Sequence, residues 1–232
     1  MKHLFFFCRY FCYFCDARTH MCVSLIRMRS LRIYPSSINE KMVDEAVEAL
    51  RGGELILYPT DTLYAIACSA LNQGAIEKIC RIKGINPQKE SLSIVCSDIS
   101  QASEYARIDN KAFRILKANL PGPFTFILPA ATTLPKIFKG RRTVGVRVPG
   151  NPIATALARE LGNPLLTTSV SYDEERSVES VSSPEVVALA YADKVSLIID
   201  GGDVPGEPST VVDITDSSLP EIVRQGAGML ID

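Results

Sequence analysis

Hydrophobic positions follow two alternating patterns along the chain: short apolar runs, and longer stretches with apolar residues every three or four positions. The first pattern predicts buried strands, and the second predicts amphipathic helices. Strands are expected at 31–35, 54–59, 92–97, 124–130, 144–149, 164–170, 195–202, 209–215 and 221–226. Helices are expected at 37–53, 74–84, 109–122, 151–162 and 183–192.

Capping residues mark the ends of these predicted helices. Ser37 and Glu40 form a capping box for the first helix, and Gly52-Gly53 follows its last turn. The apolar stripe of this helix consists of Ile38, Met42, Val43, Ala46 and Leu50. Three other helix ends are indicated by Gly84, Asp109 and Asn151.

The order of the predicted elements indicates the fold class. Strands and helices alternate over most of the chain, which is typical of an α/β domain. The last three strands follow one another without helices, so the sheet is expected to be mixed. No repeat, low-complexity tract or linker interrupts the pattern. We therefore expect residues 28–232 to form one α/β domain on a mixed sheet.

Residues 1–27 differ from the rest of the chain. They hold both histidines and four of the seven cysteines. Cys8, Cys12 and Cys15 have the spacing that radical S-adenosylmethionine enzymes use for an iron–sulfur cluster, and a zinc site from these cysteines and the histidines is a second alternative. We favour a third interpretation, in which residues 1–27 are an atypical extension, either disordered or upstream of a true start at Met28.

Composition narrows the class of protein. A hydrophobic content of 47% with 22% charged residues is typical of a soluble globular protein, and the net charge of -1 provides no general attraction to nucleic acid. No segment approaches the roughly 20 apolar residues of a membrane span. Cys68, Cys80 and Cys96 lie in apolar segments, as buried thiols do in a reducing compartment. We expect a cytoplasmic protein without a membrane partner.

Hydroxyl side chains recur where the predicted strands end. Ligands of open α/β sheets bind beyond strand ends, and small hydroxyl groups can donate to ligand oxygens. Lysines and arginines near these hydroxyls would suit a phosphate. No P-loop and no G-x-G-x-x-G motif is present. The pattern predicts a phosphate-binding site from Thr60, Thr62, Thr167, Ser169, Ser171, Ser209 and Thr210 with Lys83, Lys89, Arg147 and Arg224.

Eight segments occur in the order typical of one protein family: YPTDTLYAI, CRIKG, PGPFTFILP, VGVRVP, TTSVS, LIIDGG, STVVDIT and IVRQGA. From Met28 onward the chain resembles the YrdC-like family of threonylcarbamoyl-AMP synthases, and within it the YciO subgroup. The resemblance implies a twisted mixed α/β sheet with flanking helices and a concave ligand cleft. It also implies a reaction that joins threonine, bicarbonate and ATP into threonylcarbamoyl-adenylate, releases pyrophosphate and serves tRNA modification.

The resemblance implies roles for individual residues. Lys83 matches the catalytic lysine that faces the phosphates, and Arg147 matches the arginine that holds the threonine carboxylate. ATP would enter as its Mg²⁺ complex, without a metal site made by the protein. The implied nucleotide-binding residues are Lys83, Lys89, Ser169, Ser171, Ser209 and Arg224. The implied threonine-binding residues are Thr60, Thr62, Tyr64, Arg147 and Thr167.

Three positions depart from the synthase pattern. Ile85, Ser171 and Cys96 stand where the synthases have arginine, asparagine and histidine. These departures fall on working residues of the family, whereas the framework motifs are intact. We therefore expect a synthase-like protein in which synthesis can be weak or lost.

Two alternative functions remain open beside the synthase-like one. One is a protein that binds double-stranded RNA or tRNA without the synthase chemistry. A group of basic residues favours it, although the chain after its first 30 residues is net negative. The other alternative is adenylation of a different acid. The sequence predicts no oligomeric state. The basic residues are Lys136, Lys139, Arg141, Arg142 and Arg147.

Overall fold

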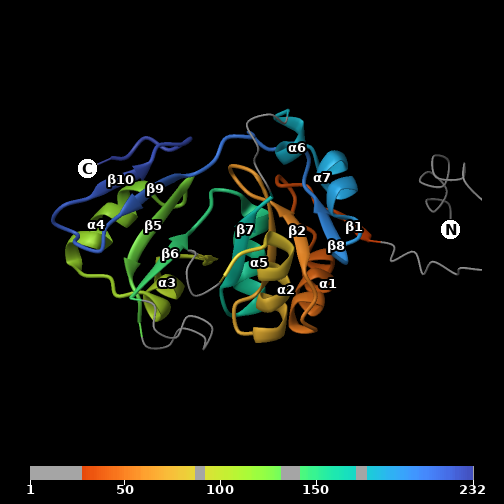
Figure 1. Ribbon diagram of the computed structural model, residues 1–232, viewed down its shortest axis with the longest axis horizontal. Helices are drawn as coiled ribbons and strands as arrows, with labels where there is room; N and C mark the ends of the chain where they lie inside the picture. The colour runs from red at the N-terminus through yellow and green to blue at the C-terminus, as the bar shows by residue number, and fades with distance from the viewer. Residues whose placement is uncertain (1–27, 87–91, 132–141, 171–176, 232) are drawn as a thin grey trace, which may run out of the picture.

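The computed structural model of the chain describes residues 28–86, 92–131, 142–170 and 177–231. These residues form a single α/β domain around one mixed sheet of ten strands, with helices packed against it (Figure 1). The predicted fold class is confirmed. Residues 1–27, including the candidate iron–sulfur and zinc ligands, lie outside the described residues.

The ten strands are arranged in the order β1-β8-β2-β3-β7-β4-β6-β5-β9-β10. The pairs β1–β8, β8–β2, β4–β6 and β5–β9 are parallel, and the other neighbours are antiparallel. The sheet is therefore mixed, as predicted. The strands are β1 (Arg29–Arg32), β2 (Ile56–Pro59), β3 (Tyr64–Ser69), β4 (Ser93–Val95), β5 (Phe124–Pro129), β6 (Thr143–Arg147), β7 (Leu165–Ser169), β8 (Leu197–Asp200), β9 (Thr210–Asp213) and β10 (Glu221–Arg224).

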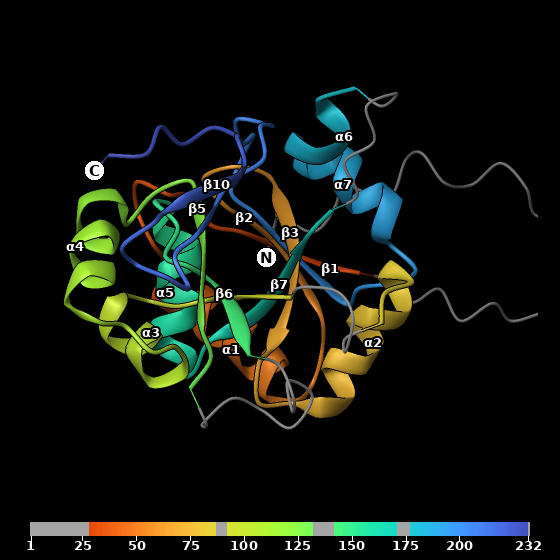
Figure 2. The same cartoon turned by 60° about the vertical axis from the view of Figure 1, so that its left-hand side comes forward.

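The helices cover both faces of the sheet. In Figure 1, α4 lies near β5 and β9, whereas α2 lies toward the end that holds β2 and β3; Figure 2 shows α4 and α2 on opposite sides of the view. None of the described helices is long and apolar enough to cross a bilayer. The helices are α1 (Glu40–Arg51), α2 (Gln73–Lys83), α3 (Ile99–Tyr105), α4 (Asn110–Asn119), α5 (Pro152–Leu161), α6 (Glu179–Ser182) and α7 (Pro184–Tyr191).

Two hydrophobic clusters hold the sheet, one on each face. Successive side chains of a strand point to opposite faces, so neighbouring residues of β2 enter different clusters. Leu57 packs in the cluster that includes residues of α2, α3 and α4, whereas Ile56 and Tyr58 pack in the cluster with α1 and α5. Burial on both faces explains why β2 appears in the sequence as a continuous apolar run.

The first helix begins later than its sequence predicted. Asn39 is the N-cap of α1, and its side chain accepts a hydrogen bond from the backbone nitrogen of Met42 at 3.4 Å. The predicted cap at Ser37 is wrong, because the Ser37 nitrogen instead donates to Tyr34 O and closes a turn before the helix. The predicted caps Asp109 and Asn151 and the end of α2 at Gly84 are confirmed.

Several short elements were not predicted. No strand was predicted at β3 and no helix at α3 or α6, and the first strand was predicted at 31–35 rather than at β1. The strand β3 is fully buried and pairs antiparallel with β2. The TDT segment is therefore the turn of a hairpin, and this turn carries the first part of the candidate site.

Helix α2 carries Lys83 at its end, and its start offers a stability test. Asn72 is the N-cap, and its Oδ1 accepts from the nitrogen of Ala75 at 3.0 Å. Asn72→Ala is expected to lower the free energy of unfolding by about 1 kcal/mol, because the Ala75 nitrogen loses its acceptor. Urea denaturation monitored by circular dichroism measures the difference. Asn72→Asp keeps the cap and should lose much less; equal losses would contradict the capping role.

Candidate functional site

The turn between β2 and β3 is fixed by the hydroxyl of Thr60. Thr60 Oγ1 donates to Leu63 O at 2.6 Å and accepts from the backbone nitrogens of Thr62 and Leu63 at 3.1 and 3.2 Å. Since its one proton is used, the Thr62 hydroxyl must donate in the 2.9 Å contact between the two side chains. In this arrangement neither hydroxyl donates to a ligand, in contrast to the general expectation for hydroxyls at strand ends.

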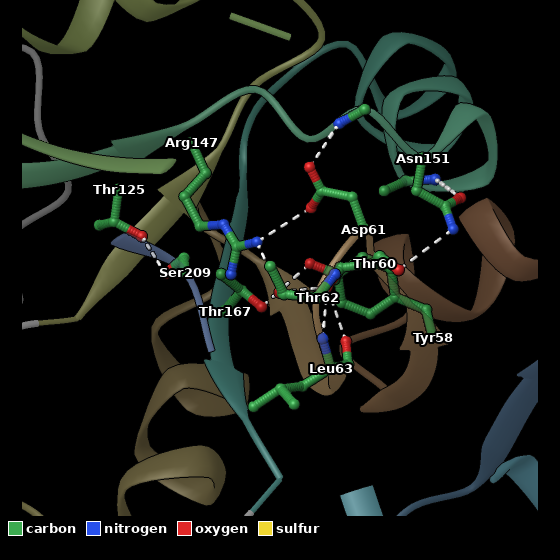
Figure 3. Close-up of polar contacts among 12 residues, drawn as sticks. Tyr58, Thr60, Asp61, Thr62, Leu63, Thr125, Arg147, Asn151, Thr167 and Ser209 are labelled. Carbon is green, nitrogen blue, oxygen red and sulfur yellow. Dashed lines mark hydrogen bonds and ion pairs between the residues drawn. The ribbon is translucent and has the colours of Figure 1, made fainter. Parts of the chain in front are cut away.

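Arg147, at the end of β6, is held against this turn (Figure 3). Its Nη2 donates to Thr62 Oγ1 at 2.9 Å and to Asp61 Oδ1 at 3.1 Å. The other oxygen of Asp61 accepts from the nitrogen of Gly150 at 2.8 Å, and Asn151 Nδ2 donates to Thr60 O at 3.4 Å. The segment after β6 is therefore tied to the hairpin turn, and the guanidinium has a fixed position.

One donor of Arg147 is left without an acceptor. The residue is only 5% exposed, and its Nε is the one buried side-chain nitrogen or oxygen of the described residues that has no hydrogen-bond partner. A buried donor without a partner is costly, and such groups in native proteins need an explanation. A carboxylate ligand would supply the acceptor, because hydrogen bonds between a guanidinium and a carboxylate are charge-assisted.

Tyr58 and Thr167 form a second buried contact below the turn. Tyr58 Oη lies 3.0 Å from Thr167 Oγ1, which in turn donates to Ile66 O at 3.4 Å. Burial raises the pKa of Tyr58 to about 12, so the phenol stays protonated near neutral pH and donates to Thr167. Thr167 therefore has an oriented hydroxyl whose proton also remains within the protein.

A third group of polar residues lies beside Arg147: Thr125 in β5, Ser209 directly before β9, and Arg224 at the end of β10. Arg224 Nη2 donates to Ser209 O at 2.7 Å and to Ser209 Oγ at 3.4 Å, and Thr125 Oγ1 lies 3.0 Å from that same hydroxyl. Burial, and after it the positive charge of Arg147, lower the pKa of Arg224. Because the two guanidiniums repel each other, an anion between them would stabilise both.

Lys83 lies at the end of α2, next to the end of β7. Its Nζ donates to Ser169 O at 3.1 Å, and Ser169 is the last residue of that strand. The ammonium group is therefore held at the strand end where the sequence analysis expected the nucleotide phosphates. Lys89 and Ser171, the remaining predicted nucleotide ligands, lie outside the described residues.

Two departures from the synthase pattern have different surroundings. Ile85 is half-buried and follows Gly84, which ends α2 in the left-handed conformation. Cys96 is completely buried in the cluster that also holds Tyr105 and Leu120, and burial raises the pKa of its thiol. Cys96 is thus a neutral core residue near neutral pH. Ser171, the third departure, is not described.

The structure connects most of the predicted site residues, although in three separate groups. Thr60, Thr62 and Arg147 are in direct contact, Ser209 contacts Arg224, and Lys83 contacts Ser169. The hydroxyl of Tyr64 contacts none of these, since it bonds to the backbone of Gly201 and Gly202. Four residues that position predicted site residues were not themselves predicted as ligands, although Asp61 lies in the predicted turn and Asn151 was predicted as a cap: Tyr58, Asp61, Thr125 and Asn151.

The implied concave cleft stays a prediction. A pocket described in the structure contains none of the predicted site residues. Its lining is Arg107, Ile108, Asp109, Ala112, Pro129, Ile214 and Thr215. Within the described ranges, no group of three or more histidine, cysteine, aspartate or glutamate side chains could hold a metal ion.

Comparisons with known proteins find similarity over most of the chain. The chain matches the Sua5/YciO/YrdC family model, described as telomere recombination, over residues 48–226. It is 40% identical over 198 residues to the Escherichia coli K12 protein YciO, described as uncharacterized; the match covers 84% of this chain and 94% of YciO. The crystal structure of E. coli YciO superposes with a TM-score of 0.79 at 39% identity, over 87% of this chain and 97% of that one.

Two further relatives carry a described activity or ligand. The Bacillus subtilis threonylcarbamoyl-AMP synthase is 32% identical over 82% of this chain and 55% of its own length. Sua5 of P. abyssi, crystallised in complex with L-threonine, superposes with a TM-score of 0.74 at 30% identity, over 86% of this chain and 57% of that one. The family match and these identities confirm the resemblance seen in the sequence: the chain belongs to the Sua5/YciO/YrdC family.

Proposed function

We propose that the protein binds threonine and ATP in one site and joins them with bicarbonate into threonylcarbamoyl-adenylate, releasing pyrophosphate. The observation that carries the proposal is the buried guanidinium of Arg147 with its unpaired Nε. A free amino acid offers the carboxylate that this group lacks. The relatives named as threonylcarbamoyl-AMP synthase and as a threonine complex support the choice of amino acid.

In this proposal, different positively charged residues bind the threonine carboxylate and the ATP phosphates. Arg147 would hold the threonine carboxylate, so that the amino group and the carbamate formed from it point toward the nucleotide. Lys83 and Arg224 would offset the negative charge that develops on the α-phosphate when a carbamate oxygen attacks it and pyrophosphate leaves. Mg²⁺ bound to ATP would share that task.

The proposal is tested by pyrophosphate release from the full chain with ATP, Mg²⁺ and bicarbonate, with and without threonine. Calorimetry with threonine, AMP and ATP, each alone and in pairs, measures binding separately from turnover. Threonine binding without turnover would support the site and exclude the synthesis. Binding of neither threonine nor a nucleotide would contradict the whole proposal.

Lys83→Ala is expected to weaken ATP binding and to leave threonine binding unchanged. A hydrogen bond to a charged group contributes about 1.5–3 kcal/mol, so ATP affinity should fall on the order of ten- to a hundredfold. Calorimetry with each ligand measures both effects. Lys78→Ala is the matched control: Lys78 lies in the same helix and donates to Gly53 O at 3.1 Å. Equal losses of ATP and threonine affinity would contradict the assignment of Lys83 to the nucleotide subsite.

The alternative that the protein binds double-stranded RNA or tRNA has no specific support among the described residues. Arg147, one of the five basic residues behind it, is buried and ion-paired with Asp61. Three others, Lys136, Lys139 and Arg141, lie outside the described residues, and Arg142 is exposed. RNA affinity that falls steeply with salt, from counterion release, would favour this alternative.

A further inference from the structure

The segment from Gly201 to Ser209 is attached to the hairpin turn by three hydrogen bonds. Tyr64 Oη donates to Gly202 O at 2.9 Å and accepts from the Gly201 nitrogen at 3.2 Å. Farther along, the Gly206 nitrogen donates to Thr62 O at 2.9 Å. The start of the segment is therefore held by Tyr64, the first residue of β3, and its middle by Thr62 in the adjoining turn.

Tyr64 has little capacity left for a ligand. Its residue is completely buried, and its one hydroxyl proton is used by Gly202 O. Burial raises the pKa of Tyr64, so the phenol keeps this proton near neutral pH. The ring fills the core next to the turn, while the hydroxyl binds only backbone atoms of the segment.

This segment carries part of the candidate nucleotide subsite. It leaves β8, the second strand of the sheet order, and reaches β9, the ninth, so it crosses between distant parts of the sheet (Figure 1). It ends at Ser209, whose carbonyl and hydroxyl oxygens accept from Arg224. A shift of the segment would therefore move Ser209 and the guanidinium that depends on it.

Two glycines of the segment pack so closely against neighbouring residues that a larger side chain would not fit. Gly206 has a φ of +83°, and a Cβ added there would lie 2.3 Å from Val178 Cγ1. A Cβ on Gly201 would lie 2.7 Å from Pro59 Cγ. Both glycines allow the backbone to approach its neighbours closely, which is the usual reason for glycine at such positions.

We propose that Tyr64 is a positioning residue for the nucleotide subsite, acting through the 201–209 segment, rather than a direct ligand of threonine. The inference rests on the proposed function, because it takes Ser209 and Arg224 as nucleotide-binding residues. The sequence resemblance implied instead that Tyr64 binds threonine. The two assignments predict different ligand affinities for the same variant.

The test uses the full chain with Tyr64→Phe, which keeps the buried ring and removes the hydroxyl. We expect AMP affinity to fall about tenfold, the loss typical of one hydrogen-bond pair, and threonine affinity to stay within about twofold of the wild type. Calorimetry measures both. In the ligand-free variant, amide hydrogen exchange at Gly201 and across residues 201–209 should be faster than in the wild type. Tyr105→Phe, which alters a buried tyrosine of α3 in the same cluster, should change none of these values.

Gly206→Ala displaces the same segment without touching Tyr64 and should give the same pattern. A Tyr64→Phe variant that loses threonine affinity and keeps AMP affinity would overturn the inference, as would unchanged exchange across the segment. If the wild type binds neither AMP nor threonine, the proposed function fails and the nucleotide role of Tyr64 fails with it. The exchange measurement still decides, without any ligand, whether Tyr64 anchors the segment.

Discussion

Arg147→Lys is expected to reduce threonine affinity on the order of ten- to a hundredfold and to leave nucleotide affinity largely unchanged. A lysine can still meet Asp61 and Thr62 with its ammonium group, so the turn should remain intact. It cannot replace the buried Nε, which in the proposed complex donates to the threonine carboxylate. Hydrogen bonds of this charged kind contribute about 1.5–3 kcal/mol, which gives the expected range.

Arg147→Ala is expected to lower both threonine affinity and stability. It should lose at least as much threonine affinity, but it also leaves the Asp61 carboxylate without its ion-pair partner in a mostly buried site. Breaking a buried pair on one side typically costs about 3–5 kcal/mol, so this variant should also unfold at lower urea. The lysine variant is therefore the cleaner test of the subsite.

Calorimetry with threonine and with AMP measures the effect, and thermal unfolding checks the fold. Arg142→Lys is the matched control, because Arg142 is exposed and precedes the other end of the same strand. If Arg147→Lys weakens AMP as much as threonine, the guanidinium belongs to a shared phosphate site. If threonine affinity is unchanged, the carboxylate binds elsewhere.

The fold could be predicted largely from the pattern of apolar positions. Nine of the strands and five of the helices were predicted, and most of them bury an apolar stripe or run in one of the two hydrophobic clusters. The wrong prediction of the first helix cap arises because neighbouring residues can all serve as the cap. Three residues that can cap a helix, Ser36, Ser37 and Asn39, precede α1, and only the structure shows that the Tyr34–Ser37 turn leaves Asn39 as the cap.

The strand β3 escaped prediction for a different reason. Its residues are apolar on both faces, so it shows no alternation, and it follows the TDT turn directly. A short run of this kind gives no periodicity that separates a strand from a buried helix. The pairing with β2 and β7 decides its conformation, and that pairing is a property of the sheet order.

The site residues could be named from the sequence, but their partners could not. Asp61 and Arg147 are 86 positions apart, and Thr125 and Ser209 are 84 apart. The pairing of β5 with β9 brings Thr125 close to Ser209. The strand order β3-β7-β4-β6 brings the end of β6 close to the turn that holds Asp61. The direction of the hydroxyl protons also required the structure: Thr60 stands in a conspicuous motif, yet its hydroxyl holds the turn instead of a ligand.

Ile85→Arg is expected to raise threonine-dependent pyrophosphate release at least about tenfold. The synthases resembled by the sequence have arginine here, two positions after the lysine that corresponds to Lys83. A planar donor at the phosphates would stabilise the charge of the transition state, and removal of one such donor typically costs about 10²–10³ in rate. Ile85 is only half-buried, so the arginine stem can lie along the apolar surface while its head reaches the solvent side.

The structure also decides which departure should not be reversed in this test. Cys96→His would place an imidazole in a completely buried apolar position, where a polar ring without a partner lowers stability. Ser171→Asn is the better companion, because the sequence resemblance places an amide there that could orient the carbamate. The double variant Ile85→Arg, Ser171→Asn should therefore exceed either single variant.

The assay is pyrophosphate release with ATP, Mg²⁺ and bicarbonate, with and without threonine, on the wild type and each variant. Ile85→Lys is the control for charge without the planar fork, and it should gain less than Ile85→Arg. A wild type that already turns over at about 1 s⁻¹ or faster, with no gain from the arginine, would mean that this position is not needed for synthesis. Folded variants that bind threonine and ATP without any turnover would mean that the barrier lies in another part of the site. Threonine binding would then support the Arg147 subsite, while the proposed synthesis would be contradicted.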